Sequence, residues 1–177
     1  MASTSRSQRR AVVLVAMALV ALVVAAPAAA VQVKLDRAWG SGTRAPIDAN
    51  STPPTFEFNA SSNADGTAPT GSFIFKTLLS AFTATVECLD VHGSTATLVG
   101  HIATATGGFD GYQGTLYVTV VQDNGVATKR HPSPDLMSAT TFGITNTTVA
   151  ALCADPTSVT GTTMFPLVSG DFTVIDR

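Results

Sequence analysis

Residues 82–102 (FTATVECLDVHGSTATLVGHI) constrain the fold more than any other stretch of this chain. Apolar residues occupy every second position from Phe82 to Cys88, with Thr or Glu between them, and this is the period of a β-strand. Gly93 then supplies the positive φ that a tight turn needs. We therefore predict a hairpin with its turn at residues 92–94. The return strand should bury one set of residues and expose the other: Ala96, Leu98, Gly100 and Ile102 against Thr97, Val99 and His101.

The same alternation recurs at residues 55–59, 72–77 and 170–175. Residues 115–122 and 136–145 are also predicted as strands, and turn-forming residues separate the predicted strands. The glycine-rich segment 104–114 precedes a strand and carries no P-loop lysine, so we interpret it as a hairpin loop. We interpret 146–161 as a long loop. The pattern predicts an all-β fold, a single antiparallel β-barrel or sandwich of about seven or eight strands, with no helix after the leader.

Residues 1–30 have the features of a helical secretory signal peptide. Three arginines precede an apolar run from Ala11 to Ala26, and a series of small residues ends at Ala30. We expect cleavage after Ala30, with Ala28 as the alternative site. The apolar run is short for a membrane span, so an uncleaved anchor is the weaker interpretation, and we expect no stable span after cleavage. The mature protein is therefore predicted to be secreted.

The segment that follows the leader, residues 31–54, is rich in Gly and Pro and predicts an irregular arm or linker. Its first residues, 31–36, alternate between apolar and polar, and a short first strand is the alternative there. Its single tryptophan, Trp39, has two interpretations: a binding aromatic, or, more commonly, a side chain that packs over the edge of a core. Residues 55–177 then form the all-β domain.

The charge balance excludes one class of partner. Three of the ten basic residues lie in the leader, whereas all twelve acidic residues follow it, so the mature chain is mildly acidic. Without a basic excess, nucleic acid is not expected as a partner. The basic run at residues 129–131 lies in a predicted loop and is interpreted as solvated.

The chain has two cysteines, and in an exported protein they most simply form one disulfide, Cys88–Cys153. A redox or metal-binding pair is the alternative, but the chain has no C-x-x-C spacing.

One set of residues suggests a metal site. Asp123, Asn124 and Asp135 provide oxygen ligands at the two ends of a predicted loop, and Ca²⁺ prefers such ligands. Their spacing does not match an EF-hand. The alternative, which we favour, is that Asp123 and Asn124 shape a turn and that Asp135 caps a strand or loop.

Catalytic motifs are not evident. The chain has no G-x-S-x-G elbow and no metalloprotease motif, and its twelve acidic residues suggest no particular pair. His92, His101 and His131 are each interpreted as surface residues rather than as a general base. We expect no cofactor and favour a protein without enzymatic activity.

Several short pieces carry a resemblance when taken in order: Cys88–Gly93, then Ala96 and Gly100, Asp123–Gly125, Pro134–Asp135 and Ser169–Val174. This order resembles a family of small secreted bacterial proteins, common in actinomycetes and mostly uncharacterised. The resemblance spans residues 56–177. It implies an all-β, barrel-like domain, and it implies neither an activity nor catalytic residues.

These observations favour a secreted, non-catalytic β-domain with a structural or interaction role at the cell exterior. The sequence does not identify its partner, for which a protein and a small apolar ligand are the two candidates. The alternative is a small-ligand-binding β-barrel that holds an apolar molecule inside. Small residues expected to face inward, Ala84, Ala96 and Gly100, motivate it because they would leave room between Phe73, Phe82 and Phe172.

Overall fold

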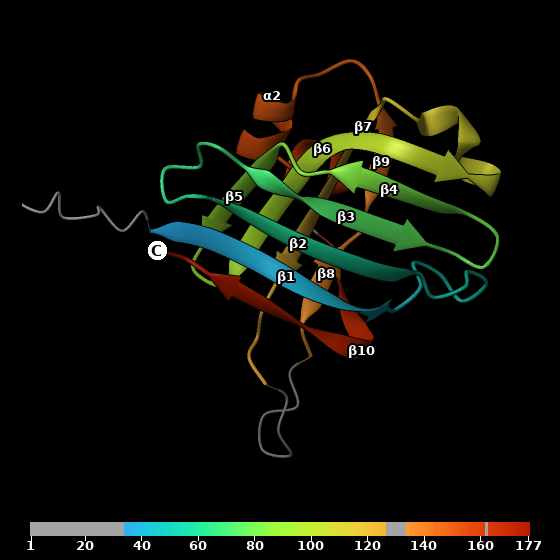
Figure 1. Cartoon of the computed structure of the whole chain (residues 1–177). Helices are drawn as coiled ribbons and strands as arrows, with labels where there is room; N and C mark the ends of the chain where they lie inside the picture. Colours follow the sequence, from blue (N-terminus) through green and yellow to red (C-terminus); the bar gives the residue numbers. More distant parts are fainter. Residues whose placement is uncertain (1–33, 127–133, 162) are drawn as a thin grey trace, which may run out of the picture. The chain divides into compact units, whose positions relative to one another are not determined.

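A computed structural model describes residues 34–126, 134–161 and 163–177 (Figure 1). The predicted signal peptide and the basic run at 129–131 lie outside these residues. Within them, no helix is long and apolar enough to cross a membrane. The strands are β1 Leu35–Arg44, β2 Thr55–Asn63, β3 Thr70–Lys76, β4 Ala81–Thr85, β5 Cys88–His92, β6 Thr95–Thr106, β7 Leu116–Gln122, β8 Leu136–Ser138, β9 Thr141–Ile144 and β10 Met164–Ile175. The helical elements are the 3₁₀ helix η1 Gly107–Tyr112 and the α-helices α2 Val149–Ala154 and α3 Thr157–Thr160.

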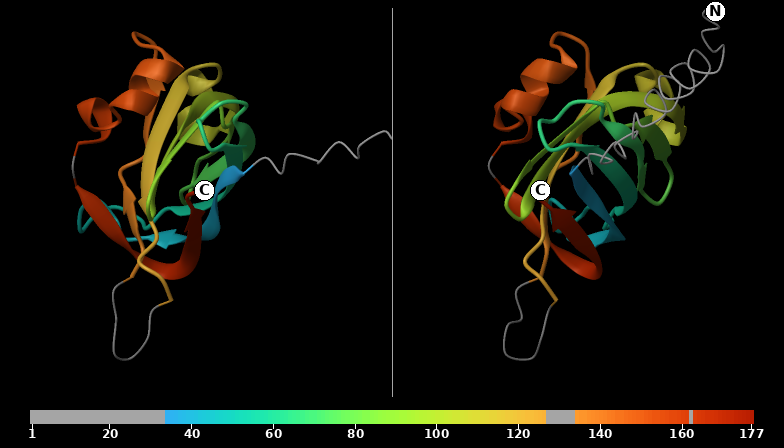
Figure 2. Two further views of the ribbon diagram at one scale, coloured as in Figure 1. Left: turned by 90° about the vertical axis from the view of Figure 1, so that its left-hand side faces the viewer. Right: turned by 60° about the vertical axis from the view of Figure 1, so that its left-hand side comes forward.

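The strand pairing confirms the predicted all-β antiparallel fold, with ten strands described rather than seven or eight. Eight of them close a ring in the order β1-β2-β3-β4-β6-β7-β8-β10, and β10 pairs with β1. The strands of the ring follow one another around it in chain order, with β5 and β9 lying outside the ring. The ring therefore has an up-and-down course that begins and ends side by side, as the view in Figure 2 shows for β1 and β10.

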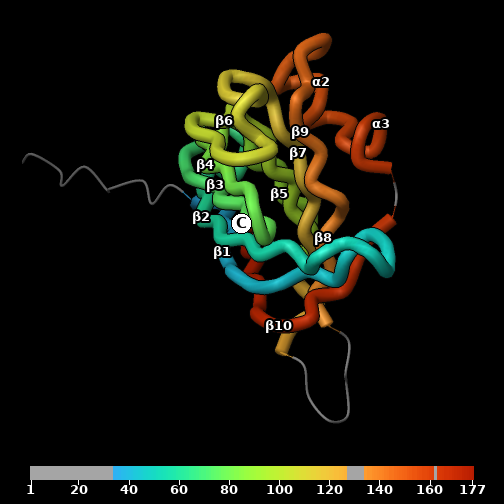
Figure 3. Tube along the Cα trace, turned by 90° about the vertical axis from the view of Figure 1, so that its right-hand side faces the viewer, coloured from blue at the N-terminus to red at the C-terminus, as the bar shows by residue number. Residues whose placement is uncertain are grey.

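The two remaining strands each lie end to end with a ring strand. β4 and β5 pair with successive parts of the same long strand, β6. β8 and β9 likewise pair with successive parts of β7. Figure 3 shows β8 and β9 following one another beside β7. The predicted single strand at 136–145 is therefore two short strands.

The hairpin predicted at residues 82–102 is present in part. Its turn and return strand are confirmed, with β5 and β6 joined at residues 93–94. The outgoing strand is wrong, because it is interrupted at residues 86–87, between β4 and β5. In β5 the buried residues are Leu89 and Val91, whereas an unbroken alternation from Phe82 would place Cys88 on the buried face. The break faces Gly100, where a Cβ would overlap the carbonyl oxygen of Thr85, so only glycine allows this close approach.

The expected irregular arm at 31–54 is wrong for residues 35–44, which form the ten-residue strand β1. The glycines of this segment argued against a strand, because Gly is depleted in strand interiors. The packing explains one of them: at Gly40 a Cβ would overlap the carbonyl oxygen of Asp171 and crowd the ring of Phe172. Trp39, on the opposite face of β1, is 38% exposed.

The inside of the ring is filled mainly by aromatic side chains. Phe73 and Tyr117 stack with their centroids 4.9 Å apart, and Phe75 and Phe82 stack at 5.5 Å. A second aromatic group, Phe56, Phe58 and Phe172, has centroid distances of 5.3 to 6.3 Å. All of these residues belong to one buried cluster with Leu98, Val121 and Met137.

A smaller cluster lies on the other face of β6 and β7, under α2. It contains Val99, Leu116, Val118, Ile144 and Leu152 together with the two cysteines. Val99 was expected to be exposed, but α2 covers it. The predicted loop at 146–161 contains both α-helices, and the N-terminus of α2 is capped by Thr148, whose side chain accepts a hydrogen bond from the Ala151 amide.

Candidate functional site

Two aspartates act as hydrogen-bond acceptors along an edge of β10. β8 pairs only with Met164–Pro166, so amides further along β10 need other acceptors. Asp135 Oδ2 accepts a hydrogen bond from the Phe172 amide at 2.6 Å, and Asp123 Oδ2 accepts one from the Val174 amide at 3.0 Å. These side chains continue the ring closure where the ladder between β8 and β10 stops. We call Asp123 and Asp135 the carboxylate seam.

The second oxygen of each seam aspartate also accepts a backbone hydrogen bond. Asp135 Oδ1 binds the Asn124 amide at 2.9 Å, and Asp123 Oδ1 binds the Gly125 amide at 2.7 Å. The Asn124 side-chain amide donates to the carbonyl of Pro134 at 2.8 Å. This arrangement supports the turn-shaping and capping roles that were the alternative to calcium binding.

The structure thus brings together all three residues predicted as calcium ligands. Each oxygen of the two carboxylates already accepts an N–H donor. Within the described residues, no group of three or more His, Cys, Asp or Glu side chains has the geometry to hold a metal ion. Calcium binding at Asp123, Asn124 and Asp135 stays a prediction, which calorimetric titration with Ca²⁺ would test.

A third carboxylate, Asp171, lies next to the seam and was not identified from the sequence. Partial burial and then the negative charge of Asp135 raise the pKa of Asp171, and Asp123 contributes further. Because Asp171 lies on the outer face of β10 opposite Ser41, it reaches solvent while it repels the seam.

Arg44, the last residue of β1, is a buried cation at the opposite end of that strand from Leu35. It is 2% exposed. Its Nη1 donates to the carbonyl of Ser138 at 2.7 Å, and the guanidinium carbon lies 5.0 Å from the centroid of the Phe165 ring. Its buried Nε has no hydrogen-bond partner. Burial lowers the pKa of Arg44.

The hydroxyl of Tyr117 is the second buried side-chain atom without a partner in the described part of the chain. Tyr117 is completely buried and pairs across the sheet with Gly100. Burial, and to a lesser extent the charge of Glu87, raises the pKa of this phenol. The side chain is therefore neutral at physiological pH.

Both described histidines contact an acid on the surface. His92 Nε2 lies 3.1 Å from Asp90 Oδ2, and His101 Nδ1 lies 2.8 Å from Glu87 Oε1. Although partial burial acts to raise the pKa of Glu87, hydrogen bonds from His101 and Thr85 lower it. No described Ser, Thr or Cys side chain hydrogen-bonds to either imidazole, so neither pair has the nucleophile of a catalytic triad. His131 lies outside the described residues.

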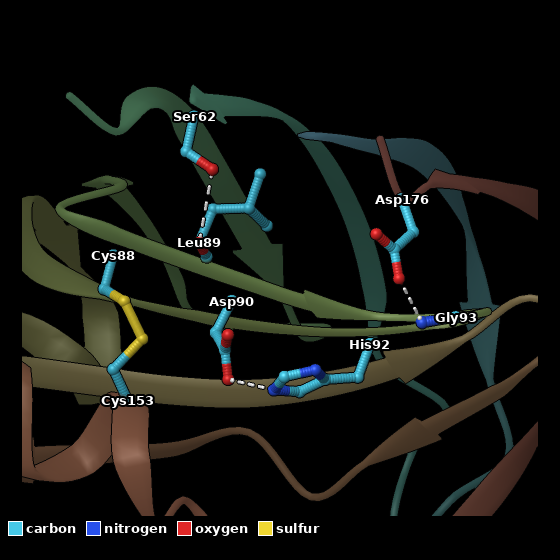
Figure 4. Close-up of polar contacts among 8 residues, drawn as sticks. All are labelled: Ser62, Cys88, Leu89, Asp90, His92, Gly93, Cys153 and Asp176. Atoms are coloured by element: carbon cyan, nitrogen blue, oxygen red, sulfur yellow. Dashed lines mark hydrogen bonds and ion pairs between the residues drawn. A yellow bond between two sulfur atoms is a disulfide. The ribbon is translucent and has the colours of Figure 1, made fainter. Parts of the chain in front are cut away.

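The surroundings of β5 are drawn in Figure 4. The predicted disulfide between Cys88 and Cys153 is present and links the start of β5 to α2. On the strand's other side, Ser62 Oγ donates to the carbonyl of Leu89 at 3.3 Å. In the turn, the Gly93 amide donates to Asp176 Oδ2 at 2.8 Å, which attaches the chain's C-terminal residues to the hairpin.

The outer face of β1, β2 and β3 carries a shallow hollow of about 210 Å³, which we call the outer hollow. Its lining is mostly polar and includes one carboxylate and one ammonium group: Ser41, Thr55, Phe56, Glu57, Ile74 and Lys76. Trp39 lies two residues before Ser41 on the same face of β1, in register with Asn59 and Thr173. An exposed aromatic and a polar hollow thus occupy one surface.

Comparisons with protein-family models, with curated proteins and with solved structures find no match to this chain. The resemblance to secreted actinomycete proteins therefore stays a prediction.

Proposed function

We propose that the protein is an exported, non-catalytic β-domain that acts by binding at the cell exterior. One observation carries the proposal: the inside of the ring is packed with side chains, while Trp39 and the outer hollow lie on an accessible surface. Exposed aromatic residues next to polar groups are typical of recognition surfaces.

The packed interior argues against an apolar ligand inside the ring. The space expected next to Gly100 is occupied by Tyr117, whose ring stacks on Phe73. Ala84 and Ala96 are buried within the same aromatic cluster. An apolar ligand of ordinary size needs a cavity of several hundred Å³, and such a ligand would have to displace these rings.

The chemistry of the outer surface fits a hydroxyl-rich polymer better than an apolar peptide. The cores of protein–protein interfaces are depleted of charge and rich in apolar area. Here Glu57 and Lys76 line the outer hollow with the hydroxyls of Ser41 and Thr55. Trp39 offers a flat apolar surface against which a sugar ring can stack. We therefore infer a polysaccharide of the cell envelope as the partner.

The disulfide and the closure of the ring both support export. The Cys88–Cys153 disulfide is of a kind that persists in oxidising compartments. We also infer that the ring of eight strands is a barrel rather than a sandwich, because each ring strand has a partner on both sides. Closure removes the long open edges that favour aggregation outside the cell.

Co-sedimentation with insoluble cell-wall polysaccharide tests the binding proposal, using residues 31–177 with the disulfide formed. Trp39→Leu should abolish most of the retention of the protein in the pellet. Tyr112→Leu is the matched control, because Tyr112 is 37% exposed, close to the 38% of Trp39, and lies in η1. If both variants are retained equally, the outer face is not the binding surface. If the unmodified protein stays in the supernatant, the polysaccharide partner is wrong.

Native mass spectrometry of culture medium tests export. The chain is expressed with its leader in a bacterial host. We expect the mass of residues 31–177 less two hydrogens, which corresponds to cleavage after Ala30 and one disulfide. A cell-bound product that retains the leader would contradict export.

A further inference from the structure

Arg44 reaches the inside of the ring because of its position in β1. The residues of β1 that face inward are Ala38, Gly40, Gly42 and Arg44, in the two-residue period of a strand. The first three are small and leave the interior to aromatic rings. The fourth places a guanidinium where Phe165 and the end of β8 surround it.

The protein satisfies only one side of this guanidinium. Nη1 donates to the carbonyl of Ser138, whereas the buried Nε has no hydrogen-bond partner. Nε and Nη2 together form the side-on edge of an arginine, the edge whose parallel N–H groups match the two oxygens of a carboxylate, phosphate or sulfate.

The charge of Arg44 is also uncompensated. Within the described residues, no carboxylate lies within 4.0 Å of its guanidinium nitrogens. The first acid after it in the chain, Asp48, is exposed and uses both carboxylate oxygens on Asn50 and Ser51. A guanidinium does not lose its proton in a protein, and a buried charge normally has a counter-ion.

The backbone around Arg44 is held in place. Its own amide donates to the carbonyl of Pro54 at 3.0 Å, and the next amide, of Ala45, donates to the carbonyl of Pro166 at 2.9 Å. Three segments of the chain thus fix the base of the side chain. The guanidinium therefore extends from a fixed backbone position.

We propose that the Nε–Nη2 edge of Arg44 is a binding site for a small oxyanion: phosphate, sulfate or the carboxylate of an organic acid. The anion supplies the missing counter-charge and accepts two parallel hydrogen bonds. Chloride supplies the charge but offers a single acceptor atom in place of the two oxygens that match the two parallel N–H groups. The site is independent of the polysaccharide surface and does not rest on it.

Thermal unfolding of the mature, disulfide-bonded protein tests the site. Phosphate, sulfate and acetate are each added up to 10 mM, about the range for a weak site, against sodium chloride at equal ionic strength. At saturation we expect the melting temperature to rise by about 5 °C, a typical shift for a domain of this size with ligand at about 100 times Kd. The anion that gives the largest shift identifies the preferred class.

Three variants make the result specific. Arg44→Met keeps the length of the side chain and its apolar packing but should lose the oxyanion shift completely. Arg44→Lys keeps the charge without the planar fork and should lose more than half of the shift. Arg37→Met is the matched control, since Arg37 is an exposed arginine on the same strand and should leave the shift unchanged.

Sulfate and phosphate also stabilise proteins through exclusion from their surfaces, so the difference between the unmodified protein and Arg44→Met is the deciding quantity. The proposal is overturned if no oxyanion raises the melting temperature above the chloride control. It is equally overturned if Arg44→Met shows the same rise as the unmodified protein.

Discussion

Asp135 and Arg44 are both almost completely buried, yet the protein satisfies only Asp135. Two backbone amides and their short hydrogen bonds occupy the two carboxylate oxygens of Asp135. Arg44 has one carbonyl, one aromatic face and a buried Nε without a partner. A satisfied buried charge is part of the fold, whereas an unsatisfied one indicates a place for something the chain does not itself provide.

The largest effect should come from removing the charge at the satisfied position. Asp135→Asn keeps the shape of the side chain but points an NH₂ group at one of the two amide donors. We expect a loss of about 3 kcal/mol in the free energy of unfolding, because a buried amide is left without its charged acceptor. Chemical denaturation measures it. Asp110→Asn, at an exposed acid in η1, is the control and should change the stability by less than about 0.5 kcal/mol. A loss for Asp135→Asn as small as for the control would mean that the seam does not support the fold.

Removing the charge of Arg44 should change the free energy of unfolding in the opposite direction. In chloride buffer, Arg44→Met should stabilise the protein by about 1 kcal/mol, because removing a buried charge without a partner outweighs one lost hydrogen bond. The measurement is again denaturant unfolding, with Arg37→Met alongside. A loss of stability as large as that of Asp135→Asn would show that the surroundings of Arg44 already compensate its charge.

Tyr117 allows the same comparison for an uncharged group, because its buried hydroxyl also has no partner. Tyr117→Phe removes the hydroxyl without a partner and leaves the stacked ring in place. We expect a gain of up to about 1 kcal/mol, since no protein hydrogen bond is lost. If this variant is destabilised instead, the hydroxyl must be hydrogen-bonded in solution, for example to a buried water.

The smallest effect concerns the charge beside the seam. The pKa of Asp171 is raised in the folded protein, so its ionised form opposes folding at neutral pH, and this cost disappears as the pH falls through the folded pKa. Asp171→Asn should therefore stabilise the protein by about 0.5 kcal/mol at pH 7, a small figure because the group is exposed. The gain should vanish in acid. Stability curves from pH 3 to pH 8 check this, and an unchanged gain at low pH would exclude charge repulsion as its cause.

The extent of prediction from the sequence differs between the fold and the sites. Alternation identified β2, β3 and β6, and β7 was identified as the strand that follows the glycine-rich segment. Alternation indicated only a possible short strand at residues 31–36 where β1 begins, because glycines stand at positions of β1 that a core residue usually occupies. It missed the interruption at residues 86–87, because a local change of faces leaves the composition unchanged.

The sites show the same limit. Asp123, Asn124 and Asp135 were found together because turn residues are recognisable locally. Asp171 and Arg44 were not, because their importance comes from contacts with residues 36 and 94 positions away. The one local signal for Arg44 is its place at the end of the series Ala38, Gly40 and Gly42, and this is visible only once β1 is known to be a strand.

The closure of the ring between β1 and β10 has a consequence for how the protein is made. The first and last strands of the domain pair with one another, and the Arg177 amide donates to Asp36 at 2.9 Å. Pairs this distant in the chain form late, since the entropy of closing the whole chain must be overcome first. A nascent chain therefore cannot complete this fold until β10 has been synthesised. Until then it exposes two unpaired strand edges, on which chaperones and proteases can act.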